Sequence, residues 1–134
     1  MRTIKFRGKN LDGEWVYGFY VEEERQTLNG FEKKHFIVND GYCYVNPKTV
    51  GQFTGLYDKD GKEIYEGDII FSQKTDCRAI LHKIEYNEEH AMFVAKPIQG
   101  WDFDFCQVRK DWIDKYGKEV IGNIHDNPEL LTNE

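Results

Sequence analysis

Apolar and polar side chains alternate along several short segments of this chain, which is the pattern of half-buried β-strands. Residues 3–8 place Ile4 and Phe6 on one side of an extended segment, with Lys5 and Arg7 on the other. The next segment puts three aromatic side chains on one face: Trp15, Tyr17 and Phe19. Because short segments of this kind recur between polar stretches, we expect a chain that is built mainly from strands.

Asp-Gly pairs separate these segments, and the glycine of such a pair accepts the positive φ that tight hairpin turns require. The pairs lie at residues 12–13, 40–41 and 60–61. A buried strand is expected over residues 69–71, and a fourth hairpin over residues 78–96 that turns at Asn87. Residues 22–30 are mostly polar, and we expect them to form a mobile connection.

Residues 105–116 follow a different period, because apolar side chains recur there at steps of three and four residues. This period predicts a short helix that ends at Gly117. A last strand is expected over residues 119–124, and Asn127 followed by Pro128 predicts the start of a short C-terminal helix. The expected fold is mainly β, α+β at most, with an antiparallel, hairpin-linked sheet or a small barrel.

Length and composition indicate a single globular domain over residues 1–134. Charged side chains make up 31% of the chain and apolar ones 40%, and no apolar run is long enough to span a bilayer. The N-terminal residues lack the apolar segment of a signal peptide, and three cysteines (Cys43, Cys77 and Cys106) are an odd number for a disulfide framework. We therefore expect a cytoplasmic protein with free thiols, no cofactor and no membrane contact.

The net charge of −6 argues against a general polyanion-binding protein, because phosphate binding needs a positive surface. The charge is nevertheless uneven, and the candidate interaction residues Lys5, Arg7 and Lys9 all project to one side of the first strand. Phe6 points to the other side, which weakens an assignment to single-stranded nucleic acid, where cations and aromatic rings share a face. The alternatives are a pairing with acidic groups of this protein or of another subunit, and a charged strand face in contact with solvent only.

The acidic turn around Gly61 can be compared with a calcium-binding loop. That loop needs oxygen ligands at its positions 1, 3 and 5, glycine at 6 and glutamate at 12. With Gly61 at position 6, Asp58 and Asp60 fall at positions 3 and 5, whereas Leu56 and Gly67 occupy positions 1 and 12. Two ligand positions are therefore empty, and we interpret the acidic residues as those of a solvated hairpin turn.

Asp102 and Asp104 are the candidate metal ligands, because alternate residues of an extended segment share a face and carboxylates bind divalent cations. Asp111 or His90 would supply further ligands to such a site. The competing interpretation is a strand whose aromatic side chains point inward and whose acids point into water.

Zinc binding and nucleophilic catalysis have less support in the sequence. The shortest cysteine–histidine spacing joins Cys77 to His82, and no second pair of zinc ligands lies near it. Ser72 is the single serine of the chain, and a serine nucleophile needs a histidine that folding brings beside it. No residue pattern favours an enzyme.

Four segments together resemble the YopX family: residues 4–9 (IKFRGK), 14–18 (EWVYG), 49–70 (TVGQFTGLYDKDGKEIYEGDII) and 120–131 (VIGNIHDNPELL). The resemblance covers nearly the whole chain in order, and its central block is long enough to be specific, while residues 22–40 and 72–118 match only loosely. The family is found in phages and prophages of Gram-positive bacteria and has no assigned activity. The resemblance therefore implies a phage-encoded accessory protein in the cytoplasm of a bacterial host, and it carries over no catalytic residue.

Three functional hypotheses follow. The first is a non-enzymatic interaction or self-assembling module whose partner is a second copy or a host or phage protein, since strand edges and aromatic patches are common association surfaces. The alternative is a nucleic-acid-binding accessory factor with a small β-barrel. A divalent-metal hydrolase that uses Asp102 and Asp104 ranks third.

Overall fold

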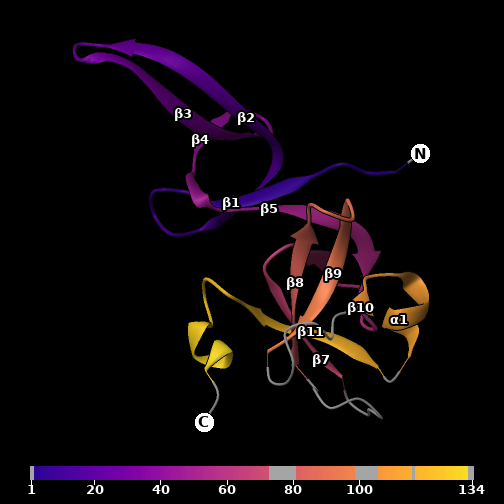
Figure 1. The fold of residues 1–134 in the computed structure, drawn as a ribbon. Coiled ribbons are helices and arrows are strands. Elements are labelled where there is room, and N and C mark those ends of the chain that lie inside the picture. The colour runs from indigo at the N-terminus through magenta and orange to yellow at the C-terminus, as the bar shows by residue number, and fades with distance from the viewer. Residues whose placement is uncertain (1, 73–80, 99–105, 116, 133–134) are drawn as a thin grey trace. The chain divides into compact units, whose positions relative to one another are not determined.

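The computed structural model describes residues 2–72, 81–98, 106–115 and 117–132, and it consists mainly of antiparallel β-strands (Figure 1). One sheet has six strands in the order β4-β3-β2-β1-β5-β6, and the other has five in the order β10-β9-β8-β7-β11. The strands of the first sheet are β1 (Phe6–Lys9), β2 (Trp15–Thr27), β3 (Gly30–Val38), β4 (Tyr42–Tyr44), β5 (Asn46–Tyr57) and β6 (Glu63–Tyr65). Those of the second are β7 (Asp68–Ser72), β8 (Leu81–Asn87), β9 (Met92–Pro97), β10 (Cys106–Gln107) and β11 (Lys118–Asn123). The prediction of a mainly β, antiparallel and hairpin-linked fold is confirmed.

The chain divides into two compact units, Met1–Phe53 and Thr54–Glu134. The first unit contains β1 to β4 and most of β5, and the second contains the end of β5, β6 and the five-stranded sheet. The expectation of a single domain over residues 1–134 stays a prediction.

A hydrogen-bonded turn fixes the register between β1 and β2 in the first unit. The side-chain oxygen of Asn10 accepts hydrogen bonds from the backbone N–H groups of Asp12 and Glu14, at 3.0 and 2.9 Å. Gly13 has a φ of 79°, the left-handed conformation that an Asp-Gly turn predicts. This turn fixes how the two strands are aligned, so each residue of β1 has a defined partner on β2.

Residues 22–30 do not form the mobile connection that their polarity predicted. They form the end of β2, the turn after it and the start of β3, and the two strands together make a long two-stranded hairpin (Figure 1). Oppositely charged side chains face each other across this hairpin: Glu23 and Lys34, Glu24 and Lys33, and Arg25 and Glu32. Opposite charges in facing positions are compatible with an extended hairpin that lacks apolar alternation, and ion pairs along each strand add to them (Arg25 with Glu23, Lys34 with Glu32). The prediction of a mobile connection was therefore wrong.

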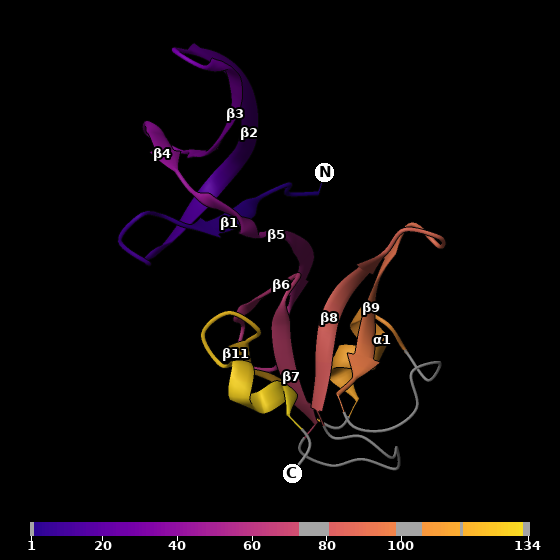
Figure 2. The same cartoon turned by 60° about the vertical axis from the view of Figure 1, so that its left-hand side comes forward.

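A hydrophobic core occupies the second unit. It collects buried side chains from five strands, from α1 (Lys110–Asp114) and from the segment before α1: Ile64, Ile70, Ile84, Ala95, Val108, Ile113 and Val120. In both views α1 lies beside β8 and β9 (Figures 1 and 2), and its Trp112 ring meets the His82 ring of β8 edge-on at 5.5 Å. The helix therefore covers one part of this sheet.

Both predicted helices are present but shorter than expected. Part of the predicted helix over residues 105–116 is instead strand β10, which pairs with β9. The backbone N–H of Val108 donates to the carbonyl of Phe93 at 3.0 Å and continues this pairing. At the C-terminus, Pro128–Leu131 forms a single 3₁₀ turn. The Asn127 side chain accepts a hydrogen bond from the N–H of Asn123 at 3.2 Å, so it ties the turn to β11.

Candidate interaction surface

The predicted interaction residues Lys5, Arg7 and Lys9 lie on one face of the first sheet, but they are not a row of solvated cations. Arg7 is only 6% exposed, and its guanidinium carbon lies 4.5 Å from the centre of the Trp15 ring. The Lys9 amine lies 5.4 Å from the same ring. The Lys5 amine lies 5.5 Å from the centre of the Phe53 ring. The interpretation of a face in contact with solvent only is therefore wrong for Arg7.

Aromatic side chains of the neighbouring strand share this face with the cations. In the antiparallel pairing of β1 and β2, Lys9 stands opposite Trp15 and Arg7 stands opposite Tyr17, and directly paired residues point to the same side of a sheet. Phe6 does point to the other side, as the sequence predicted. The rings on the cationic face come from β2, so the direction of Phe6 does not separate rings from cations. The hairpin turn at Asp12-Gly13 was the signal that places Lys9 opposite Trp15.

The same face continues onto β3 and β4. Phe19 stands opposite Val38, and Val38 stands opposite Tyr42, so the three side chains form one row across three strands. In the next row, the buried Phe36 stands opposite Tyr44, with ring centres 4.7 Å apart. We call the set Trp15, Tyr17, Phe19, Tyr42 and Tyr44 the aromatic face.

The aromatic face is accessible to a ligand. Phe19 is 65% exposed and Tyr42 is 59% exposed, and Tyr17 and Tyr44 are also exposed. Single exposed apolar residues are normal on a protein surface, but a contiguous group of them marks a site of interaction. Tyrosine in particular combines a large apolar ring with a polar hydroxyl, a combination that is common in interfaces.

On the opposite face of the β2–β3 hairpin several polar groups bind one another, as Arg25 and Glu23 do on the side of the aromatic face. The Tyr20 hydroxyl donates to a Glu22 carboxylate oxygen at 3.1 Å and lies 2.7 Å from His35 Nδ1. Burial, together with the hydrogen bond and the negative charge of Glu22, raises the pKa of Tyr20 to about 12. Lys33 lies 3.9 Å from Glu22 on this face. Each of these polar groups therefore has a partner inside the hairpin.

The acidic turn around Gly61 is exposed over residues 59–62, as expected, whereas Asp58 at its start is buried. Asp58 is 7% exposed, and its Oδ1 accepts hydrogen bonds from the N–H groups of Asp60 and Lys62, each at 2.9 Å. Its Oδ2 accepts from the N–H of Val120 on β11, also at 2.9 Å. The interpretation of a solvated hairpin is therefore wrong for Asp58, whose two oxygens both bind backbone N–H groups.

The proposed metal site cannot be placed, because Asp102 and Asp104 lie outside the described residues. Of the additional ligands, Asp111 forms a two-point ion pair with Arg109, which lowers the pKa of Asp111. His90 Nδ1 lies 2.9 Å from the Asn87 side-chain oxygen. Within the described ranges, no group of three histidine, cysteine, aspartate or glutamate side chains is arranged to hold a metal ion.

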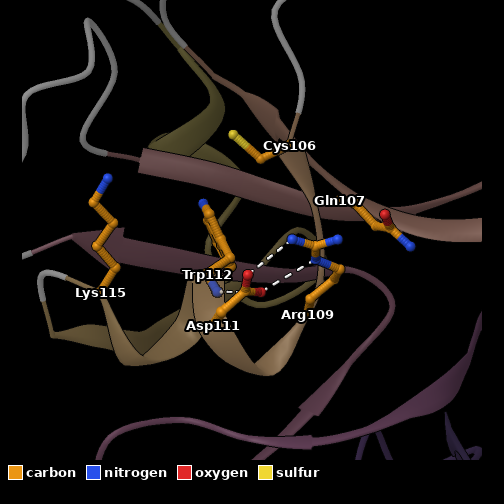
Figure 3. A pocket seen from close by; sticks show the side chains of 6 residues that line it. All are labelled: Cys106, Gln107, Arg109, Asp111, Trp112 and Lys115. Atoms are coloured by element: carbon orange, nitrogen blue, oxygen red, sulfur yellow. Dashed lines mark hydrogen bonds and ion pairs between the residues drawn. The ribbon is translucent and has the colours of Figure 1, made fainter.

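A pocket of about 280 Å³ lies beside α1 (Figure 3). It is lined by Cys106, Gln107, Arg109, Asp111, Trp112 and Lys115. The two dashed lines between Arg109 and Asp111 in Figure 3 are hydrogen bonds of 3.1 and 2.8 Å, and a third joins Asp111 to the N–H of Trp112. Because the carboxylate is paired in this way, Asp111 is a poor general base.

Ser72 and His82 are placed where a substrate has little access to them. Ser72 is 2% exposed, and His82 is buried against Trp112. The Cys43 and Cys106 side chains are half-buried, and Cys77 lies outside the described residues. The fold therefore gives Ser72 and His82 the setting of core residues.

Comparisons with known proteins agree with this description. A family model described as YopX protein matches residues 5–132. The crystal structure of protein EF1440 from Enterococcus faecalis is similar to this chain, with a TM-score of 0.57 and 27% sequence identity, over 98% of this chain and 100% of that one. No curated protein matches the chain. Among the helices of the described segments, none has the length and apolar character needed to cross a membrane.

Proposed function

The chain belongs to the YopX protein family, and we propose that it is a non-catalytic binding module that engages its partner through the aromatic face. In the phage setting that the family resemblance implies, such a module acts as an accessory protein. Its partner in this role is a second copy or a host or phage protein, and nucleic acid is the alternative.

One observation carries the proposal, namely that exposed aromatic rings and cations gather on one face of the first sheet. Phe19 and Tyr42 present most of their surface to solvent, although they lie in one continuous row. Leaving this much apolar surface exposed costs stability, at roughly 25 cal/mol for each Å² of apolar surface left in water. A binding role explains why such a face is kept.

The second unit supports a non-catalytic role less directly. Its pocket beside α1 contains an Arg109–Asp111 ion pair, and the buried Lys118 amine donates to the Lys115 carbonyl at 2.7 Å. These charged groups therefore bind groups of the protein itself. These interactions of the described residues hold the second unit together.

The test compares three immobilised proteins: the wild type, the double variant Phe19→Ala/Tyr42→Ala, and the control Phe31→Ala. Phe31 is 70% exposed and lies on the opposite face of the same hairpin. Its substitution therefore removes a similar area of exposed aromatic surface outside the aromatic face. Each protein is exposed to an extract of bacterial cells, and retained protein and retained nucleic acid are quantified separately.

We expect the wild type and Phe31→Ala to retain protein or nucleic acid from the extract, and we expect the double variant to retain less of it. Light scattering of the three purified proteins tests whether the partner is a second copy. In that case the wild type and Phe31→Ala have the mass of an oligomer, and the double variant has the mass of a monomer. Equal retention and equal mass for all three proteins would show that the aromatic face is not the binding surface.

A further inference from the structure

We infer that the aromatic face binds single-stranded nucleic acid, with bases stacked on its rings and phosphates beside its lysines. This inference rests on the proposed function and names the class of ligand. Proteins that bind single strands without strict sequence preference combine aromatic rings with positive charge along a groove or sheet face.

The rings have the arrangement that successive bases require. Trp15, Tyr17 and Phe19 follow one another on one side of β2, and alternate residues of a strand are separated by about 6.6 Å. This spacing is about twice the ~3.4 Å repeat of stacked bases, so each ring offers a separate platform to a base. Tyr42 adds a ring in the direction across the strands.

The cations border these rings on the same face. Lys9 stands directly opposite Trp15, and the amine of Lys5 lies over Phe53 on the strand at the other side of β1. Both lysines are half-buried, and the long stem of such a side chain lies along apolar surface while its charged end stays at the surface. Phosphates that follow a strand of stacked bases would meet positive charge along β1.

Charge is also segregated between the two units, which removes the objection raised by the negative net charge. Residues 1–53 contain eight basic and seven acidic side chains, whereas residues 54–134 contain ten basic and seventeen acidic ones. The first unit thus has a net charge of +1 and the second a net charge of −7. The unit that carries the aromatic face is therefore not the source of the acidity.

The geometry favours an unpaired strand over a duplex or a polypeptide. A sheet face with exposed rings stacks on bases that are splayed out, and the bases of a duplex are already stacked on each other. An apolar peptide would gain nothing from the lysines beside the rings. A polypeptide partner is one outcome of the test below.

The experiment measures fluorescence anisotropy of labelled oligothymidylate and oligouridylate of about 12 nucleotides on titration with the full chain. The two oligomers distinguish DNA from RNA, and a duplex of the same length is the third arm. Each titration is repeated between about 50 and about 200 mM salt, because neutralised phosphates give a linear loss of affinity with the logarithm of salt concentration.

We expect binding of at least one single strand and weaker binding of the duplex. Phe19→Ala is expected to lower the affinity at least about five-fold, as is Tyr42→Ala, because each removes one stacking platform. Lys9→Gln is expected to reduce the salt slope by about 0.7. Phe31→Ala and Lys33→Gln, on the opposite face of the hairpin, are the matched controls and leave the affinity unchanged.

Two results would overturn the inference: no binding of either oligomer at the lowest salt, or binding that Phe19→Ala and Tyr42→Ala leave unchanged. If neither oligomer binds while the double variant still loses protein captured from the extract, the aromatic face binds a polypeptide. The proposed function then stands and only its assignment to nucleic acid fails. If the face variants affect neither experiment, both proposals fail.

Discussion

The side chain of Asp58 accepts a hydrogen bond from the backbone N–H of Val120, 62 residues further along the chain, at 2.9 Å. The same carboxylate accepts two more from the turn that it begins. Asp58 thus joins the turn between β5 and β6 to the edge strand β11. The acidic block around Gly61 therefore contributes to the fold through a buried carboxylate that accepts three backbone hydrogen bonds.

Replacing Asp58 is expected to destabilise the protein strongly. Asp58→Ala leaves three N–H groups without their acceptor, and hydrogen bonds to a charged group contribute about 1.5–3 kcal/mol each. We expect a loss of about 3 kcal/mol or more in the free energy of unfolding, measured by urea denaturation. Asp58→Asn, which keeps one oxygen, should lose roughly half as much.

The matched control for this prediction is Asp60→Ala in the same turn. The Asp60 side chain is exposed, and surface substitutions of this kind usually change stability by less than about 0.5 kcal/mol. A loss of similar size for Asp60→Ala and Asp58→Ala would contradict the assigned role. A calcium-dependent rise in the urea midpoint of the wild type would support a metal ion at this turn instead.

Gly18 cannot be replaced by alanine without moving the backbone of β3. A Cβ atom at this position would lie 2.2 Å from the carbonyl oxygen of Val38 and 2.9 Å from its carbon. Overpacking of this kind costs about 1–3 kcal/mol, and here the obstacle is backbone that cannot change rotamer. We expect Gly18→Ala to lower the urea midpoint and to reduce the yield of folded protein.

Gly41→Ala is the corresponding control. An added Cβ there meets nothing within 4 Å, and Gly41 does not have the positive φ found at Gly13. We expect its unfolding transition to match that of the wild type. If Gly18→Ala were equally neutral, the close approach of β2 and β3 at this point would be disproved.

Local signals in the sequence were sufficient to predict most of the fold. The turns at Gly13 and Gly61 have the positive φ that their Asp-Gly pairs predict, and the strands on either side of each turn pair as expected. Residues 22–30 were mistaken for a connection because their strand pairing depends on charges that face each other only once the hairpin has formed. Apolar periodicity carries no information about such pairs.

The candidate site depended on relationships between strands, and the sequence revealed them only in part. The three cations at and next to β1 were identified, but the burial of Arg7 follows from the Trp15 ring that β2 brings over it. The row of Phe19, Val38 and Tyr42 requires the register of three strands at once. The bond from Asp58 to Val120 spans two distant segments, and no local pattern predicts it.

The charge pairs of the β2–β3 hairpin predict a salt-sensitive variant. Glu24→Lys places two lysines directly opposite each other, because Glu24 pairs with Lys33. Like charges in this arrangement destabilise a sheet by about 0.2–1 kcal/mol. We expect the urea midpoint to fall at low salt and the difference from wild type to shrink at about 1 M salt, where charges are screened.

Glu88→Lys makes the same charge change in the exposed turn between β8 and β9, and it serves as the control. We expect it to lie within about 0.5 kcal/mol of the wild type at low salt. An equal effect of the two substitutions would point to net charge rather than to the cross-strand pair.

The raised pKa of Tyr20 predicts a loss of stability at high pH. The folded protein holds the Tyr20 proton up to about pH 12, because burial and Glu22 disfavour the phenolate, whereas an unfolded tyrosine loses its proton near pH 10. The unfolded state therefore binds fewer protons between these values. The stabilisation is fully present below about pH 10 and is lost as the pH rises from 10 to 12.

The measurement is the urea midpoint of the wild type and of Tyr20→Phe across this range. Tyr20→Phe also removes the hydroxyl contacts with Glu22 and His35, so we expect it to be less stable at neutral pH. Its midpoint should nevertheless fall less steeply than that of the wild type between pH 10 and 12. Tyr42→Phe, the same change at an exposed tyrosine, corrects for the other titrating groups, and parallel curves for the wild type and Tyr20→Phe would contradict the prediction.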